Sequence, residues 1–107
     1  MYKVEKEVKA IRDFYRISRK TLHIISGIGI NQIAEYEKGS IPNKSNYLLI
    51  MSIVNINGFE RLFHASKNLL KSNTIERIEK KIEKETKWRH IEAMRYKYEL
   101  MEIMLKQ

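Results

Sequence analysis

The hydrophobic positions of this chain recur at helical spacing from one end to the other. Over residues 4–16, large apolar side chains stand three or four positions apart, which places them on one face of an α-helix. Shorter runs of the same kind cover 20–26 and 30–38, and two more follow over 46–54 and 59–70. Strand-type alternation is nearly absent. The pattern therefore predicts an all-α fold with five short helices and a longer C-terminal helix.

Local signals mark the ends of the second and third helices. Ser18 is placed to cap the start of the second helix, and Gly27-Ile28-Gly29 separates the second from the third. Gly39 supplies a stop after the third helix, and Pro42 prevents that helix from continuing. These signals predict two short helices joined by a tight turn.

Polar clusters also predict the boundaries of the later helices. Ser45 or Asn46 is expected to cap the fourth helix, and the stretch 55–58 to end it. Asn73 and Glu76 stand at the spacing of a capping box, which predicts the start of the last helix there.

The last helix carries two apolar stripes. The first consists of Ile75, Ile78 and Ile82. The second is longer and is out of phase with the first across residues 83–87; it consists of Trp88, Ile91, Met94, Tyr98, Met101 and Leu105. The shift predicts either a kink or a change of packing partner at that point.

Charge narrows the class of partner. The 107 residues carry a formal net charge of +8, which suits an anionic partner such as nucleic acid, a membrane surface or an acidic protein. The excess is uneven, because residues 1–73 hold twelve Lys and Arg against six Asp and Glu, whereas residues 74–107 hold nine against seven. The basic excess therefore lies in the front part, and the mixed charges of the tail are typical of an exposed helix.

Composition excludes several other functions. The chain has no cysteine, so disulfides, zinc ribbons and thiol nucleophiles are ruled out. No secretory signal and no apolar run of membrane-spanning length is visible, and a soluble cytoplasmic protein is expected. The three histidines show no metal-ligand spacing, and no catalytic motif is present. We expect no metal, no cofactor and no enzymatic activity.

Residues 11–42 form the most informative stretch. Two short helices joined by a turn containing glycine, with a basic helix before them, are the arrangement of a helix-turn-helix unit. A small core would set the angle between these helices, so that the second can lie in the major groove of DNA. The residues expected in that core are Ile11, Leu22, Ile25, Ile28, Ile33 and Tyr36.

At these positions the chain resembles the phage-repressor-like helix-turn-helix family, also called the xenobiotic-response-element type. The residues that carry the resemblance are Ile17-Ser18-Arg19, Leu22-His23, Gly27-Ile28-Gly29, Ile33, Glu37, Gly39 and Pro42. A narrower likeness is to the helix-turn-helix half of zinc-ribbon antitoxins and related regulators. It is carried by Gly27-Ile28-Gly29-Ile30-Asn31, Tyr36-Glu37-Lys38-Gly39 and Pro42-Asn43-Lys44-Ser45. It extends, more weakly, to about residue 83.

The chain departs from the family pattern at four positions. Arg19 replaces the usual Gln, and Gly29 replaces the usual Ser or Thr cap, although Gly29 agrees with the narrower group. His23 replaces a small residue where the two motif helices meet. Glu35 stands where many relatives have Arg or Gln facing DNA, and its carboxylate would be repelled by phosphates.

The resemblance implies a five-helix DNA-binding domain over residues 1–72. It does not cover residues 73–107, which are expected to form a C-terminal helical extension. The apolar stripe of that extension predicts either a homodimer or a helix that folds back on the fifth helix. The implied function is sequence-specific binding of double-stranded DNA by a transcriptional repressor or autoregulator. The residues expected to contact DNA are Arg16, Arg19, Lys20, Ile30, Asn31, Gln32, Glu35, Lys38 and Lys44. Two alternatives stay open: an antitoxin-like or phage-type module that binds a toxin or phage protein, and an RNA-binding protein, which only the charge favours.

Overall fold

The fold consists of helices throughout its described part. The computed structural model describes residues 2–106, without the side chains of 88–93, 96 and 98, and none of these residues forms a strand. The predicted all-α class, with five short helices and one long one, is confirmed. The elements are α1 (Glu5–Tyr15), α2 (Arg19–Ser26), α3 (Ile30–Glu37), α4 (Lys44–Val54), α5 (Ile56–Ser66), a 3₁₀ turn η1 (Lys67–Leu69) and α6 (Ser72–Leu105).

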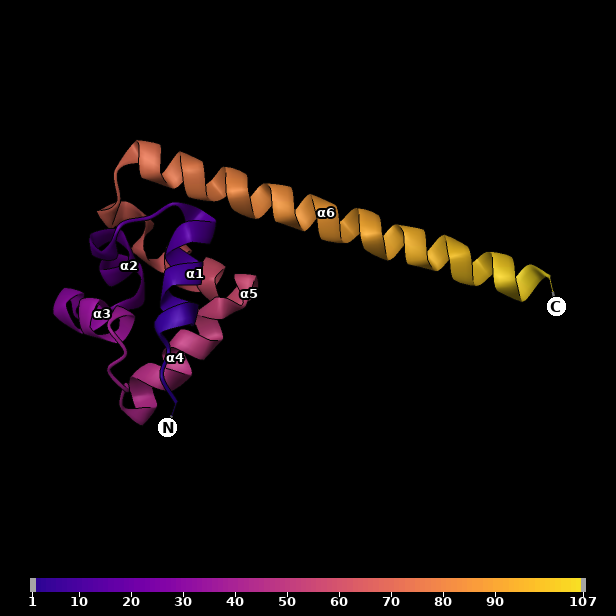
Figure 1. Ribbon diagram of the computed structural model, residues 1–107. Helices are drawn as coiled ribbons and strands as arrows, with labels where there is room; N and C mark the ends of the chain where they lie inside the picture. The colour runs from indigo at the N-terminus through magenta and orange to yellow at the C-terminus, as the bar shows by residue number, and fades with distance from the viewer. Residues whose placement is uncertain (1, 107) are drawn as a thin grey trace.

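The five short helices pack into one body around α1. Helix α1 contacts α3 and α4, while α2 lies between α3 and α5, and α4 packs against α5. Helix α6 crosses the end of this body against α1 and then extends well beyond it (Figure 1). We call the part of α6 beyond the body, residues 88–105, the distal arm.

An aromatic stack occupies the centre of the body. Phe59 and Phe63 are fully buried, and the Phe59 ring stacks on Tyr15 with ring centroids 3.7 Å apart. The residues predicted for the helix-turn-helix core are all buried: Ile11, Leu22, Ile25, Ile28, Ile33 and Tyr36. Burial of one such side chain stabilises a fold by about 1.5–3 kcal/mol. The burial of these apolar residues therefore accounts for the packing of α1, α2, α3 and α5.

The predicted caps of the short helices are confirmed in part. The Ser18 hydroxyl accepts a hydrogen bond from the Thr21 amide at 3.1 Å and caps α2, as predicted. Gly39 follows the end of α3 with a φ of +105°, also as predicted. The cap of α4 is Asn43, whose side chain accepts from the Asn46 amide at 2.8 Å, so the prediction of Ser45 or Asn46 was wrong.

The corner between α4 and α5 is tighter than predicted. A single residue, Asn55, ends α4 and caps α5, so Asn57 and Gly58 lie inside the first turn of α5 instead of between helices. A Cβ at Gly58 would lie 2.1 Å from the Ser52 carbonyl oxygen, which explains why glycine stands at this crossing. The fifth helix also ends earlier than predicted, at Ser66. Leu69, which was predicted to belong to it, lies in η1, and Leu70 lies in the loop after η1.

Helix α6 begins where the sequence predicted, but it lacks the predicted cap and the kink that was one of two expectations. It begins at Ser72 after Lys71, without a capping side chain, so the predicted Asn73–Glu76 capping box was wrong. It also runs without interruption through 83–87, where a kink was one of two expectations. Ion pairs one helical turn apart continue through this region and support the helix: Glu76 with Lys80, Lys81 with Glu85, and Glu83 with Lys87.

The second expectation, a change of packing partner, stays a prediction, because the described side chains of the distal arm leave the body without meeting a second packing surface. Ile78 and Ile82 are buried against the body, whereas Leu100, Met101 and Leu105 of the distal arm are exposed. Within the described residues the arm does not fold back on α5. The side chains of Trp88, Ile91 and Tyr98, which belong to the predicted second stripe, lie outside the described residues.

None of the helices in the described part of the chain combines the length and apolar character that a membrane crossing requires.

Candidate nucleic-acid interface

Helices α2 and α3 are joined by the short turn that the sequence predicted. Gly27 ends α2 with a φ of +78°, a left-handed conformation that glycine adopts without strain, and its amide donates to the His23 carbonyl at 2.9 Å. Gly29 then begins α3, and its amide donates to the side chain of Gln32 at 3.2 Å. The turn is therefore held at both ends by hydrogen bonds within the unit.

His23 fixes the turn from the side of α2. Its Nδ1 lies 2.7 Å from the Ile28 carbonyl oxygen, and because a carbonyl only accepts, Nδ1 must carry the proton. The pattern described above has a small side chain at this position. The larger His23 side chain makes a hydrogen bond across the turn instead. The departure from the family pattern is accommodated without separating α2 from α3.

Helix α3 presents one face to the body and another to solvent. Ile33, Tyr36 and Glu37 are buried. The residues predicted to face base edges are all exposed on the other side: Ile30, Asn31, Gln32 and Glu35. Of these four, Gln32 already uses its carbonyl oxygen at the Gly29 amide, and Glu35 pairs with Lys38 at 3.7 Å.

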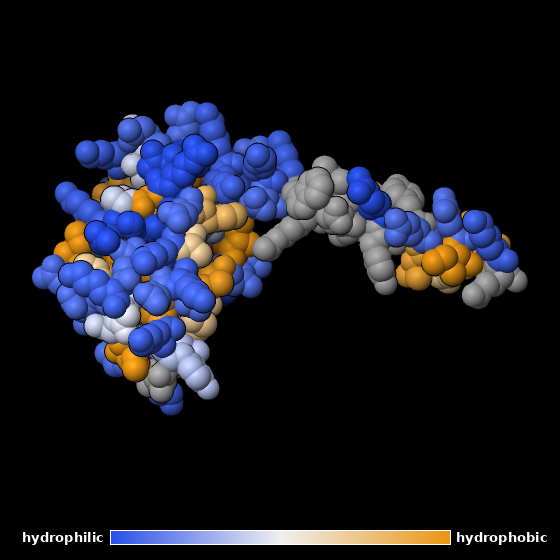
Figure 2. Space-filling view, viewed as in Figure 1, coloured by the Kyte–Doolittle hydropathy of each residue, from blue (hydrophilic) through white to orange (hydrophobic). Residues whose placement is uncertain are grey.

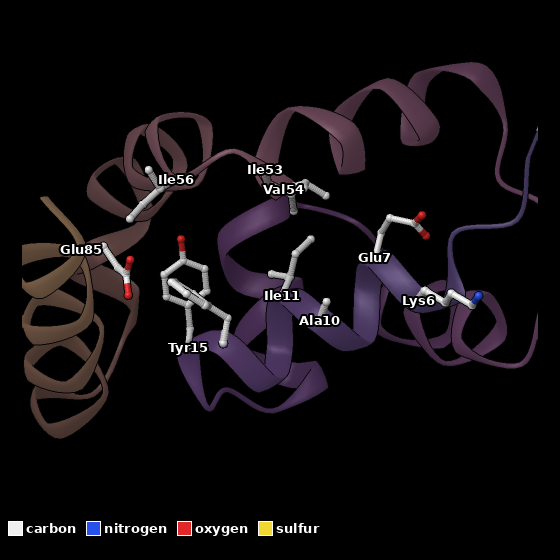
Figure 3. A pocket seen from close by; sticks show the side chains of 10 residues that line it. Lys6, Glu7, Ala10, Ile11, Tyr15, Ile53, Val54, Ile56 and Glu85 are labelled. Carbon is white, nitrogen blue, oxygen red and sulfur yellow. The ribbon is translucent and has the colours of Figure 1, made fainter. Parts of the chain in front are cut away.

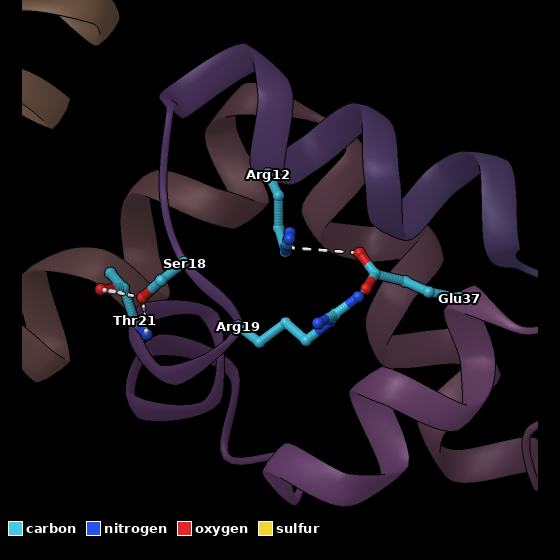
Figure 4. A network of polar contacts seen from close by, with 5 residues as sticks. All are labelled: Arg12, Ser18, Arg19, Thr21 and Glu37. Atoms are coloured by element: carbon cyan, nitrogen blue, oxygen red, sulfur yellow. Dashed lines mark hydrogen bonds and ion pairs between the residues drawn. The ribbon is translucent and has the colours of Figure 1, made fainter.

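A buried ion network ties the three helices of the unit together (Figure 4). The Glu37 side chain on α3 is only 3% exposed and contacts Arg12 of α1 and Arg19 of α2. The Arg19 Nε–H donates to one carboxylate oxygen. The Arg12 Nε lies 3.3 Å from the other, in charge contact but without the alignment of a hydrogen bond. Glu37 was recognised only as part of a family pattern, and its burial between two arginines was not predicted.

The network gives Arg19 a partner inside the chain. This residue was predicted to hold a phosphate, but its guanidinium is engaged by Glu37 and its side chain is half-exposed. The other predicted phosphate contacts are exposed: Arg16 at the end of α1, Lys20 in the first turn of α2 and Lys44 at the start of α4. Lys38, which was also predicted to contact DNA, is exposed at the end of α3.

A hydrogen bond fixes α3 against α4. The Asn46 side-chain amide donates to the Tyr36 hydroxyl at 2.8 Å. Asn46 was expected to cap α4, and instead it holds the last turn of α3 at a set distance from the start of α4. The exposed face of α3 and Lys44 therefore belong to one rigid surface.

An apolar hollow lies on another side of the body, between α1, the α4–α5 corner and α6 (Figure 3). Its walls include Ile11, Tyr15, Ile53 and Ile56, and its charged lining residues are Lys6, Glu7 and Glu85. None of the predicted DNA-contacting residues lines it, so the hollow is separate from the α3 surface.

Comparisons of the chain with family models, with curated proteins and with solved structures find no match.

Proposed function

We propose that this chain binds double-stranded DNA in a sequence-specific manner, with α3 in the major groove, and acts as a transcriptional repressor or autoregulator. The observation that carries the proposal is the geometry of α3. The helix packs against α1 and α2, and a hydrogen bond from Asn46 to Tyr36 joins it to α4. It exposes Ile30, Asn31, Gln32 and Glu35. A rigid helix with an exposed polar face is what base readout in the major groove needs.

Asn31 is the residue best placed for direct readout. It lies in the first turn of α3, is exposed, and makes no side-chain hydrogen bond to any described residue. Its amide can donate to N7 and accept from N6 of one adenine, a pair worth about 1–3 kcal/mol of discrimination. Ile30 is exposed beside it and can contact a thymine methyl group.

Cations at the ends of the neighbouring helices would hold the DNA backbone. Lys20 and Lys44 lie in the first turns of α2 and α4, whose N-terminal ends carry partial positive charge. Arg16 and Lys38 are exposed at the ends of α1 and α3. These contacts would position the protein without contributing sequence information.

We also propose that the chain acts as a homodimer. Helix-turn-helix proteins usually read two half-sites about one DNA turn apart, and one body presents a single α3. The distal arm supplies an uncovered apolar surface (Figure 2), to which exposed Leu100, Met101, Ile103, Met104 and Leu105 contribute. Apolar surface of this kind is typical of protein interfaces.

The experiment compares Asn31→Ala with Lys20→Ala on a duplex selected from a random pool. Asn31→Ala is expected to weaken binding to the selected duplex by about 1–3 kcal/mol and to relax the preference at one base pair. Lys20→Ala is expected to weaken binding to every duplex and to reduce the salt slope by about 1. An Asn31→Ala protein that melts earlier but selects the same sequence with equal strength would show that Asn31 only stabilises the helix.

A protein-interaction module is the second candidate, and Glu35 is the observation that favours it. Its carboxylate is exposed in the middle of the α3 surface and would be repelled by phosphates, although Lys38 lies 3.7 Å away. Under the DNA-binding proposal, Glu35→Gln should tighten binding to random duplex. A chain that binds neither duplex nor single-stranded pools, with or without this substitution, would favour a protein partner.

A further inference from the structure

A basic surface lies where α1 ends, α2 begins and α6 crosses the body. Two adjoining hollows meet there and share Arg16 and Arg77 as lining residues. One extends toward the start of α2 and the loop before α6, and the other runs along α6. The cations that line the two hollows, which together define the basic surface, are Arg16, Lys20, Lys71, Arg77, Lys80, Lys81 and Lys84.

Most of this positive charge is unpaired within the described residues. Lys80 pairs with Glu76 at 3.0 Å. Lys81 lies 3.8 Å from Glu85 and 4.3 Å above the centre of the Phe14 ring. The remaining five cations have no ion-pair partner among the described residues: Arg16, Lys20, Lys71, Arg77 and Lys84.

Mutual repulsion makes such a cluster unfavourable for the isolated chain. Like charges gathered on one surface destabilise a fold unless an anion or solvent ions offset them. All five side chains are exposed, so none of them is needed to fill the core. The cluster is therefore better explained by an external anion than by the stability of the body.

The extent of the basic surface favours a polyanion over a single small anion. Arg77 and Lys84 stand seven residues apart on one helix, which corresponds to about 10 Å along its axis. Lys20 and Lys71 lie at the other end of the surface, in the hollow near the start of α2. One phosphate group cannot contact both ends, whereas a strand of nucleic acid presents successive phosphates.

We propose that the basic surface binds the phosphodiester backbone of duplex DNA next to the sequence that α3 reads. The inference rests on the proposed function and extends its footprint from α2 onto α6. Lys20 connects the two, because it belongs to the basic surface and also to the first turn of α2, the helix before the turn. Arg77, Lys84 and Lys71 add contacts that carry no sequence information but raise affinity on long DNA.

The test uses the full chain and the charge-neutralising double substitution Arg77→Gln/Lys84→Gln. Its matched control is Lys97→Gln/Lys106→Gln, which removes the same charge from the exposed far end of the same helix. Binding is measured as a function of salt on two duplexes that contain the selected sequence: one of about two helical turns, which just covers two half-sites, and one of about three turns.

On the longer duplex, Arg77→Gln/Lys84→Gln is expected to reduce the slope of log K against log salt by about 1.8 for each bound protomer, because each protomer loses two phosphate contacts. Between 50 mM and 200 mM salt this corresponds to about a tenfold smaller loss of affinity per protomer than in the unsubstituted chain. On the shorter duplex the substitution should change the slope little, and the control should change it little on both.

Equal slopes for the two double variants on the longer duplex would overturn the proposal. The same would follow if Arg77→Gln/Lys84→Gln reduced the slope equally on both duplexes, since the contacts would then lie inside the site. A chain that selects no sequence but shows the predicted difference on a three-turn duplex would overturn base readout by α3 and support the basic surface. Failure of the unsubstituted chain to bind any duplex would overturn both.

Discussion

The body and the distal arm use similar residues in opposite ways. In the body, apolar stripes on six helices meet, and Ile78 near the start of α6 has no exposed surface. In the distal arm the same helix continues, yet Leu100 is 47% exposed and Leu105 is 83% exposed. Figure 2 shows this contrast as a mainly hydrophilic surface over the near end of α6 and a hydrophobic patch at its tip.

This difference separates side chains that stabilise the fold of a single chain from side chains that stabilise it only when a second surface covers them. A buried stripe contributes to folding because its surface leaves water when the helices pack. The exposed side chains of the arm gain nothing from folding of a single chain, so their contribution appears only when a second surface covers them. Four expected outcomes follow, ordered by their effect on the free energy of unfolding.

A matched pair of substitutions in α6 gives the largest contrast. Ile78→Ala should lower the free energy of unfolding by about 2–4 kcal/mol, because it leaves a cavity beneath the helix. Leu100→Ala should change it by less than about 0.5 kcal/mol in dilute protein. Denaturant titration followed by circular dichroism measures both, and equal losses would mean that the distal arm packs on its own body.

The buried ion network should give the next largest effect. Glu37→Gln leaves Arg12 and Arg19 facing a neutral amide, and we expect a loss of about 2–3 kcal/mol, below that of a fully buried pair because Arg19 is half-exposed. As a control, Glu35→Gln removes an exposed carboxylate from the same helix and should cost little. A Glu37→Gln protein as stable as the Glu35→Gln protein would contradict a stabilising role for the network.

Substitutions at the helix starts should change the free energy of unfolding less, and they test the caps directly. Asn43→Ala should cost about 1 kcal/mol, because it removes the cap of α4. Asn73→Ala, at the start of α6, should cost little because that side chain caps nothing. Thermal unfolding of the two proteins compares them, with Ser45→Ala as a second control at the position favoured by the sequence pattern.

Removal of the distal arm should have the smallest effect on unfolding and a large effect on assembly. A chain ending at Lys87 keeps Ile78 and Ile82 against the body, so its free energy of unfolding in dilute solution should change by less than about 0.5 kcal/mol. Light scattering should show a dimer for the full chain and a monomer for the shortened one. A full chain that is monomeric at high concentration would disprove the homodimer.

The fold was predictable where the signal is local. Helical spacing identified the six helices, and the apolar residues around the α2–α3 turn identified its core, because both depend on residues close together in sequence. The cap of α4 was missed because Asn43, Ser45 and Asn46 are all suitable residues within one turn. Only the packing of Asn46 onto Tyr36 decides between them.

The candidate site was less predictable because its charges come together from distant parts of the chain. Glu37 is buried only because Arg12 and Arg19 reach it from two other helices. The basic surface was not predicted, because its cations also come from distant parts of the chain. Counting charge by segment gave the tail a small excess, whereas the fold places Arg77 and Lys84 of that tail beside Arg16.

The unbroken course of α6 has a mechanical consequence. Among the described side chains of α6, Ile82 is the last that is buried against the body. From Ile82 to Leu105 the helix spans roughly 35 Å, so a rotation of about 10° at its root displaces the tip by about 6 Å. The helix can act as a lever, because its first part packs on the body and its longer second part extends beyond it. Under the proposed function, a second copy that holds the tip would also set the angle at which α3 of the same body meets DNA. One residue inserted after Lys87 would turn the tip by about 100° around the helix axis and aim its apolar side chains in a new direction.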